Sequence, residues 1–472
     1  MSLVLRERSI LRLADHQVKH AFWVLALLSL IALVAVTLFF YNLNFFNWQI
    51  NSDDAFNFIR AIERFSVLEF RPHFPGYPAF IAVIHLFSLF YELSLNALIA
   101  YTSFSVLSIA LISAYIVYLH TKNLAMMLLC FSCLILSPLL LGLSLSGLSD
   151  APALMLLCLA LLFSYQGRAF CMGGAVALML ATRPSYLPLA VSLLLFLPLF
   201  ENKKKALLVA SVPILVVALL SLFFLMSKDG VAYFSEGIRF TQGHFLIWGN
   251  TSAEQQSSVW AWCSHIIKLM GGLGVFLLIA TLLLSLFDKA YFIKALAILT
   301  VIYLIYILVA QNPDNIRHFS PVYCLFLVLF FTQLHKVYYK SLGGLLVVLI
   351  LQPYLSFYQA QYQHNNAKND PTNQAINYLQ EVASSSSNKP MLLATNYNVH
   401  WVKDQLKSVA VLDSYYPSSE ITIKNSFAWR LSGSALNSSD YMLIKTFNKR
   451  LPTERTLYLY RVIESKKNSF KL

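Results

Sequence analysis

The sequence predicts an all-α polytopic membrane protein with a small α/β domain at its C-terminal end. Hydrophobic residues make up 58% of the 472 residues and charged residues only 12%, against roughly 25% charged residues in soluble domains. Apolar runs close to the length that crosses a bilayer recur along most of the chain. The composition becomes polar after about residue 358.

The net charge of +13 does not indicate a nucleic-acid-binding protein. Few basic residues cluster on any one face, and no soluble basic domain precedes the apolar runs. The positive balance fits basic loops on the cytoplasmic side of a membrane together with a site for an anionic substrate. Most of the six cysteines lie inside apolar runs, so we interpret the pair Cys130 and Cys133 as helix packing and not as a metal or redox site.

The N-terminus predicts an uncleaved first span with the chain start on the cytoplasmic side. Arg6, Arg8, Arg12 and Lys19 precede an apolar run over residues 22–41. That run is too long for the core of a signal peptide, and no small-residue cleavage site follows it.

Loop charges orient the other spans. The basic loops at 203–205, 289–294 and 336–340 belong inside by the positive-inside rule. Counting from them places the loop 227–263 and the tail after residue 358 outside. About eleven spans result, in a range of 11 to 13. The eleven are 22–41, 97–119, 124–143, 151–165, 169–182, 184–200, 206–226, 264–286, 292–310, 319–335 and 341–358.

We expect the apolar segment 76–92 not to cross the membrane. It has about 17 residues and follows a proline-rich stretch that begins at Pro72. If it crossed, Asp150 would lie inside and His120 outside, against the charge rule. A juxtamembrane or re-entrant helix is expected instead.

Residues 359–472 are interpreted as a small α/β domain outside the cytoplasm, and residues 1–358 as the transmembrane domain. Asp370 and Pro371 are typical N-cap and first helical residues, which predicts a helix as far as about residue 382. Short apolar runs predict four strands, at residues 391–394, 409–412, 441–444 and 457–460.

Two adjacent acids, Asp53 and Asp54, follow the first span in a chain where charge is scarce. The residues after them have an apolar face at helical spacing, which predicts a short helix on the membrane surface. Helix capping explains the pair locally. A third acid, Asp150, stands where a span re-enters the membrane from outside. Acids at that depth usually face a cavity, although Asp150 before Pro152 also fits a helix start.

Arginine is concentrated on the same expected side of the membrane. The positive-inside rule alone would deplete both Lys and Arg there. Arg side chains bind phosphate with two parallel hydrogen bonds, whereas Lys acts as a point charge. An outer cavity with several Arg and two or three acids therefore suggests phosphate binding next to a general base. The arginines are Arg60, Arg64, Arg71, Arg183, Arg239 and Arg317.

Five short motifs occur in an informative order. They are Asp53-Asp54, Arg71-Pro-His73-Phe74-Pro75-Gly-Tyr77-Pro78, Ser137-Pro138 followed by Ser149-Asp150, Thr182-Arg183-Pro184, and Asn315-Ile-Arg317-His318-Phe-Ser-Pro321. Over roughly residues 20–340 they resemble the polyprenyl-phosphate-dependent glycosyltransferases of the GT-C fold. The likeness is greatest to the branch with protein O-mannosyltransferases and lipid A aminoarabinose transferases, which carry an acidic pair in the first outer loop, here residues 42–75.

The resemblance implies a role for each matched residue. Asp53 would be the general base, and Asp54 would orient it or share a divalent cation (Mg²⁺ or Mn²⁺) with it. Asp150 would shape the acceptor or sugar site. Arg183 and Arg317 would bind the phosphate of the donor. The sugar and acceptor stay unassigned, because the second acid is Asp where the nearest relatives have Glu, and Phe-Pro replaces their Pro-Pro.

Four further residues are candidates for substrate or phosphate binding, and three of them have an alternative structural interpretation. His73 is either a substrate ligand or a loop-packing residue. His318 is either a phosphate partner or an interfacial histidine bonded to a backbone carbonyl. Arg60 and Arg71 are candidates for substrate or phosphate binding, and Arg60 also fits the solvated face of the surface helix.

The sequence thus predicts an integral membrane glycosyltransferase, a hexosyl- or pentosyltransferase. It would move a sugar from a polyprenyl-phosphate-linked donor to a glycan, lipid or protein acceptor. The expected location is the bacterial inner membrane, with the C-terminal domain in the periplasm or outside the cell. One alternative is a transporter or flippase of a lipid-linked glycan, which should carry ionisable residues in mid-membrane. Another is an O-antigen polymerase- or ligase-like enzyme, which should carry its key residues in the loop 227–263.

Overall fold

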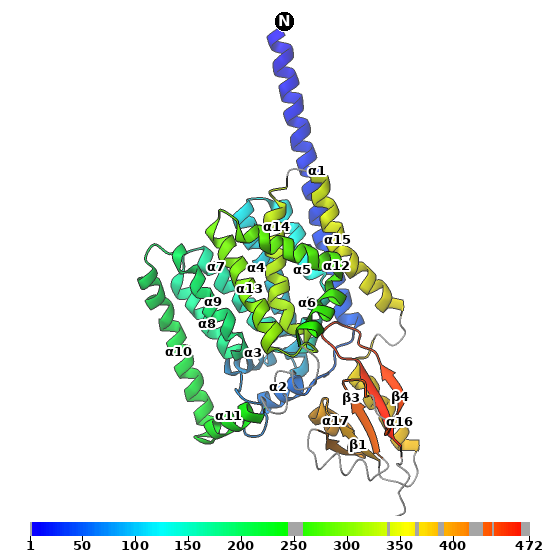
Figure 1. Cartoon of the computed structure of the whole chain (residues 1–472). Coiled ribbons are helices and arrows are strands. Elements are labelled where there is room, and N and C mark those ends of the chain that lie inside the picture. The colour runs from blue at the N-terminus through cyan, green and yellow to red at the C-terminus, as the bar shows by residue number, and fades with distance from the viewer. Residues whose placement is uncertain are drawn as a thin grey trace, which may run out of the picture.

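The fold is a bundle of membrane helices with a small sheet domain at one end (Figure 1). It is seen in a computed structural model, which describes residues 2–243, 258–337, 340–363, 368–385, 391–414, 428–436 and 439–463. The bundle helices are α1 (Ser2–Phe45), α4 (Ser94–Thr121), α5 (Leu124–Ile135), α6 (Pro138–Ser146), α7 (Asp150–Tyr165), α8 (Ala169–Thr182), η1 (Pro184–Tyr186), α9 (Leu187–Ser192), η2 (Leu193–Leu199), α10 (Lys203–Asp229), α12 (Ser258–Leu286), α13 (Tyr291–Ala310), α14 (Ser320–Leu334) and α15 (Lys340–Gln363).

Among the residues that the structure describes, seven helices are long and apolar enough to cross a membrane, and α5 with α6, bent by 55°, makes an eighth candidate span. Three shorter apolar segments, α7, α8 and residues 184–199, run between the same two ends of the bundle and make up the difference from the eleven expected spans. The helix α3 (Pro78–Ser88) has 11 residues. At 1.5 Å per residue it is about 16 Å long, roughly half the hydrocarbon core, so the segment 76–92 does not cross as one helix.

Side-chain caps and prolines set where several helices begin. Asn123 caps α5, and Asn202 caps α10, each by accepting hydrogen bonds from backbone N–H groups of the first turn. Pro138 occupies the first turn of α6, where its missing N–H costs nothing. Ser52 caps α2 (Asp53–Glu63) and accepts a hydrogen bond from Ala55 N. The two acids therefore open α2, as expected, but neither of them is its N-cap.

The two ends of the bundle differ in chemistry. At the end away from the sheet domain, Lys336 pairs with Asp288, and the Asn123 side chain lies 3.3 Å from His335 Nδ1. The end that carries the sheet domain holds the turns before α7 and after α8 and the turn η5 (Ile316–Phe319) before α14. The helix α11 (Ala232–Gly243) lies beside α2 at that end (Figure 1). The predicted inner loops and the predicted outer acids thus fall at opposite ends.

The C-terminal domain is built on a five-stranded sheet in the order β2-β1-β3-β5-β4. β1 is parallel to β2 and β3, and β5 is antiparallel to β3 and β4. Its elements are α16 (Pro371–Ser385), β1 (Leu392–Thr395), α17 (Val399–Gln405), β2 (Ala410–Asp413), β3 (Ala428–Ser432), β4 (Tyr441–Phe447) and β5 (Leu457–Val462).

This domain has a hydrophobic core of its own, in which Ile376 and Leu379 of α16 pack with Leu393 and Leu459 of the sheet. The helix after Asp370 and the four expected strands are confirmed. The Asp370 carboxylate caps α16 and accepts hydrogen bonds from the N–H groups of Thr372 and Asn373. The sequence analysis missed β3.

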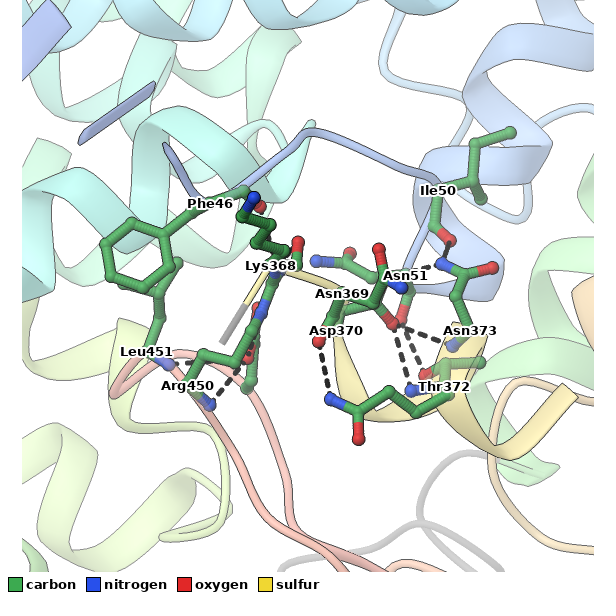
Figure 2. A network of polar contacts seen from close by, with 12 residues as sticks. Phe46, Ile50, Asn51, Lys368, Asn369, Asp370, Thr372, Asn373, Arg450 and Leu451 are labelled. Atoms are coloured by element: carbon green, nitrogen blue, oxygen red, sulfur yellow. Dashed lines mark hydrogen bonds and ion pairs between the residues drawn. The ribbon is translucent and has the colours of Figure 1, made fainter. Parts of the chain in front are cut away.

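Polar side chains of the C-terminal domain bind the chain between α1 and α2 (Figure 2). Arg450 donates to the carbonyl oxygens of Phe46 (2.6 Å) and Lys368 (2.7 Å), while its guanidinium pairs with Glu454. Asn373 donates to the Ile50 carbonyl at 2.8 Å. Because backbone carbonyls in an irregular segment need partners when covered, these contacts fix the segment that leads into α2.

We predict that Gly173→Ala destabilises the bundle, because an added Cβ would collide with the Ala210 backbone carbonyl of α10, which cannot swing away. Overpacking of this kind costs about 1–3 kcal/mol. The matched control is Gly174→Ala, where the nearest atom is Pro213 Cβ at 4.0 Å. Thermal unfolding of the purified protein in detergent measures both. Equal melting temperatures for the two variants would contradict the close approach of α8 and α10.

A second prediction concerns pH. Burial, together with the nearby Glu454 charge, raises the pKa of Asp370 from 3.8 to about 6 against the opposing effect of Arg450. The folded state therefore prefers the protonated acid. Stability from this group is fully present below pH 3.8 and is lost as the pH rises through about 6, on the order of 3 kcal/mol in total.

Asp370→Asn keeps a good N-cap but cannot titrate. We expect the melting temperature of the unmodified protein to fall relative to that of Asp370→Asn between pH 4.5 and pH 7.5. A difference between the two proteins that stays constant across this range would show that Asp370 does not titrate there.

Candidate functional site

A buried ion pair lies where α7 begins and α8 ends. Asp150 is the first residue of α7, and Arg183 is the residue at which α8 stops. Arg183 Nη1 lies 3.0 Å from Asp150 Oδ2, and the two side chains are 10% and 0% exposed. Arg183 also donates to Ser149 Oγ at 3.0 Å and lies over the Tyr186 ring. The sequence analysis did not identify Ser149 or Tyr186 as partners of Arg183.

Arg317 joins this pair to the acids of α2. Its Nε lies 3.7 Å from Asp150 Oδ2, and its Nη2 lies 3.7 Å from Asp54 Oδ2. The turn η5 just before α14 presents this side chain toward α7. Residues from three distant parts of the chain thus form one chain of alternating charges, Asp54, Arg317, Asp150 and Arg183.

His73 completes the cluster on the other side of Asp54. Its Nδ1 lies 3.5 Å from Asp54 Oδ1, and its Nε2 lies 2.8 Å from the Tyr77 hydroxyl. The imidazole also stacks on Phe240 of α11 at a ring distance of 5.5 Å. His73 therefore contacts the acid and packs its loop at the same time. Tyr77 stands in the same Pro-rich motif as His73, which was the available sequence signal for it.

The two neighbouring acids of α2 have opposite electrostatic surroundings. Burial would raise the pKa of Asp54, but His73, Arg317 and Arg183 outweigh that effect, and the pKa is lowered. For Asp53, burial dominates and raises the pKa, although His400 and two backbone N–H groups oppose it. Asp54 is thus held as a carboxylate among cations.

Asp53 faces the C-terminal domain. Its Oδ1 accepts a hydrogen bond of 2.9 Å from the N–H of Trp401, in the first turn of α17. Its own N–H donates to Asn398 Oδ1 at 3.2 Å, and Asn398 donates in turn to the Asn51 carbonyl. A carboxylate at a helix N-terminus is favourable for both partners. The sequence held no signal for this contact between Asp53 and α17.

The two acids do not converge on one point. The oxygens of Asp54 face His73 and Arg317, whereas Asp53 faces the start of α17. In the described part of the chain, no three His, Cys, Asp or Glu side chains are grouped as a metal site. The residues present therefore do not fit a Mg²⁺ or Mn²⁺ ion shared by Asp53 and Asp54, which the resemblance left open beside an orienting role for Asp54.

The other expected site residues are divided between two places. His318 is buried in the same turn as Arg317. Arg60 and Arg71 lie apart from the buried cluster and line a separate cavity against α17.

A second, larger cavity of about 870 Å³ lies between the bundle and the C-terminal domain. Its walls include apolar side chains of α12, α14 and α15, among them Leu269, Phe326 and Ile350. Its polar part includes Lys268, and Arg455, which donates to Asn315 Oδ1 at 3.1 Å. The cavity thus has an apolar part and a cationic part, and it adjoins the segment that carries Arg317.

Chemically, the cluster can do two things. Arg183 and Arg317 form a cationic corner that can hold a phosphate with charge-assisted hydrogen bonds. Asp54, on the edge of this corner with a side chain 38% exposed, can accept a proton from a group that approaches the phosphate.

The comparison with solved structures identifies the fold. The chain matches ArnT from Cupriavidus metallidurans bound to undecaprenyl phosphate, with a TM-score of 0.54 and 11% identity, over 93% of this chain and 98% of that one. The apo form of the same protein matches with a TM-score of 0.53, 11% identity and the same coverage. ArnT is a GT-C lipid A aminoarabinose transferase. This chain has the GT-C fold, as the sequence predicted.

A more distant likeness is to the Archaeoglobus fulgidus oligosaccharyltransferase in complex with Zn and sulfate. Its TM-score is 0.46 at 13% identity, over 86% of this chain and 67% of that one. No family model matches the chain, and no curated protein matches it significantly in sequence.

We predict that Asp150→Ala destabilises the protein by about 3–5 kcal/mol, because Arg183 would be left as an uncompensated buried charge. The control is Asp314→Ala, which removes a carboxylate that is 44% exposed and 3.7 Å from Arg455. Exposed ion pairs contribute about 0–1 kcal/mol. Thermal unfolding in detergent compares the two, and similar losses would contradict the burial of the Asp150 pair.

Proposed function

We propose that this protein is a membrane glycosyltransferase that moves a sugar from a polyprenyl-phosphate carrier to an acceptor on the side of the membrane that bears the C-terminal domain. The observation that supports it best is Arg317, which lies 3.7 Å from Asp54 and 3.7 Å from Asp150, with Arg183 beside it. From this arrangement we infer a cationic phosphate site next to an ionised carboxylate. The GT-C fold, shared with a protein whose structure contains undecaprenyl phosphate, supports a lipid-phosphate donor by analogy.

The donor fits the large cavity beside α12, α14 and α15. A polyprenyl phosphate has an apolar chain and one anionic group, which matches the apolar part and the cationic part of the cavity. We infer that the polyprenyl chain of the donor lies against Leu269, Phe326 and Ile350. The phosphate would lie toward Arg317 and Arg183.

The reaction follows from the charges. A hydroxyl or similar nucleophile of the acceptor attacks the anomeric carbon, and the bond from that carbon to the phosphate oxygen breaks. The nucleophile gives its proton to a carboxylate, and the leaving phosphate gains negative charge. Arg183 and Arg317 stabilise that charge, because they are already ordered around Asp150 and need little reorganisation.

Of the two acids, we assign the proton to Asp54 and a positioning role to Asp53. Asp54 faces the two arginines, whereas an oxygen of Asp53 is already bonded to the N–H of Trp401. The sequence analysis gave these roles in the reverse order. Asp150 is assigned to holding the arginines, and His73 to orienting Asp54.

The distribution of charge supports a transferase over a transporter. The ionisable side chains of the cluster come from the first turn of α2, the loop before α3, the start of α7, the end of α8 and the turn before α14, all at one end of the bundle. We infer a bacterial inner membrane location, with this side in the periplasm or outside the cell. We propose that the donor sugar is a hexose or a pentose, which a glycan profile of a deletion strain distinguishes.

We predict that Asp54→Asn lowers transfer at least about 100-fold while the purified protein still binds undecaprenyl phosphate. Asp53→Asn should keep most activity, because an Asn oxygen can still accept the Trp401 N–H, and the loss should be under about tenfold. A deletion strain complemented with each variant, with its envelope glycans profiled by mass spectrometry, measures transfer and identifies the sugar.

The converse result, loss of transfer in Asp53→Asn and full transfer in Asp54→Asn, would show that Asp53 and not Asp54 is the general base. A glycan profile unchanged by the deletion, together with no binding of undecaprenyl phosphate, would overturn the glycosyltransferase proposal itself.

A further inference from the structure

The smaller cavity, the one lined by Arg60 and Arg71, has a volume of about 620 Å³, lies on the opposite side of α2 from the arginine cluster and is shared by the two domains. One wall is the face of α2 that carries Phe56 and Arg60. A second wall is the loop that includes Arg71. The third wall is α17 and the residues after it, with His400 and Lys403.

The cavity carries an excess of positive charge. Arg60, Arg71, Lys403 and Lys407 line it, against two acids, Glu69 and Asp404. One of these acids is largely neutralised from outside, since Glu69 Oε1 lies 2.6 Å from Arg64 Nη2.

The two arginines are held close together with few protein partners. The only described hydrogen bond from the Arg60 side chain goes to Asn57 Oδ1 at 3.3 Å. Arg71 Nε is buried without a hydrogen bond to a described residue, and its nearest carboxylate oxygen, on Glu69, is 3.6 Å away. Burial and then the neighbouring Arg71 lower the pKa of Arg60. Guanidinium groups placed in this way are suited to share an anion.

The cavity shares its α17 wall with the binding partner of Asp53. Asp53 bonds to Trp401 in the first turn of α17, and His400, one residue earlier, lines the cavity and lies 3.3 Å from the Asn57 amide. Arg60 follows Asp53 by seven residues on the same helix, which is about 10 Å along its axis. An anion held at Arg60 would therefore lie about one sugar unit, measured along the helix axis, from the start of α2.

We propose that this cavity binds an anionic group, a phosphate or a carboxylate, of the acceptor, and so selects acceptors that carry one. The proposal rests on the proposed function for the identity of the ligand. The donor phosphate and the acceptor anion then occupy two separate cationic sites on opposite sides of α2. The C-terminal domain contributes His400, Lys403 and Lys407 to the second of them.

The first test measures anion binding directly. Purified full-length protein is saturated with undecaprenyl phosphate, which occupies the buried arginine cluster, and is then titrated with inorganic pyrophosphate by calorimetry. We expect the double variant Arg60→Gln/Arg71→Gln to weaken pyrophosphate binding at least tenfold. The matched control is Arg239→Gln, on α11, 67% exposed and outside the cavity. Equal pyrophosphate affinity in the double variant and the control would overturn the proposal.

Failure of the proposed function gives a different result, because undecaprenyl phosphate itself would then not bind. Two single variants, Lys403→Gln and Lys407→Gln, keep the test valid if the double arginine variant does not fold. Each of them should weaken pyrophosphate binding without changing undecaprenyl phosphate binding.

The second test identifies the anion on the acceptor. Membranes from the deletion strain serve as acceptor after treatment with a phosphatase, or after conversion of carboxylates to amides with carbodiimide and glycinamide. If the phosphatase lowers transfer by the unmodified protein to the level of Arg60→Gln/Arg71→Gln, the anion is a phosphate. If the carbodiimide treatment does so, the anion is a carboxylate. If neither treatment lowers transfer, and the double variant transfers at the full rate, the cavity does not select the acceptor.

Discussion

The site depends on one constraint, the need to compensate Asp150. A carboxylate that is fully buried cannot stay ionised without partners, because removing it from water costs several kcal/mol. Arg183 and Arg317 meet that need, one from the end of α8 and one from the turn before α14. Since neither can move away without leaving a buried charge alone, the acid fixes both guanidinium groups in the unliganded protein. A cationic site is thereby ordered before any anion arrives.

The helix α2 lies between this bundle site and the C-terminal domain. Successive helical residues point about 100° apart, so two adjacent acids at its start cannot face the same partner. Asp54 faces the arginines and Asp53 faces α17. The carbonyls of the segment before α2 are bonded by Asn373, Asn398 and Arg450 (Figure 2). The C-terminal domain thus sets the position of the acids without touching the buried pair.

Much of the fold could be predicted from the sequence, because hydropathy and loop charge determine where a chain crosses a membrane. The non-crossing of 76–92 followed from its length and prolines. The strand β3 was missed because Ala428–Ser432 is a short run interrupted by Arg430, and parallel pairing with β1 leaves no hairpin signal nearby. Asp54, Asp150, Arg183 and Arg317, all candidates from the sequence, lie together in the structure, but their contacts could not be predicted. Nothing local in the sequence connects Asp53 with Trp401, which lies 348 positions later in the chain.

That separation has a consequence for how the protein is made. A ribosome delivers the chain from its N-terminus, so the acids of α2 are synthesised long before Trp401, Asn398 and Arg450. Until then the carbonyls of Phe46, Ile50 and Asn51 can bond only to water. The bundle can insert and pair Asp150 with Arg183 during translation, but the acids acquire their fixed position only when the last hundred or so residues fold against them. A chain that stops early would hold the buried pair of Asp150 and Arg183 without ordered acids at the start of α2.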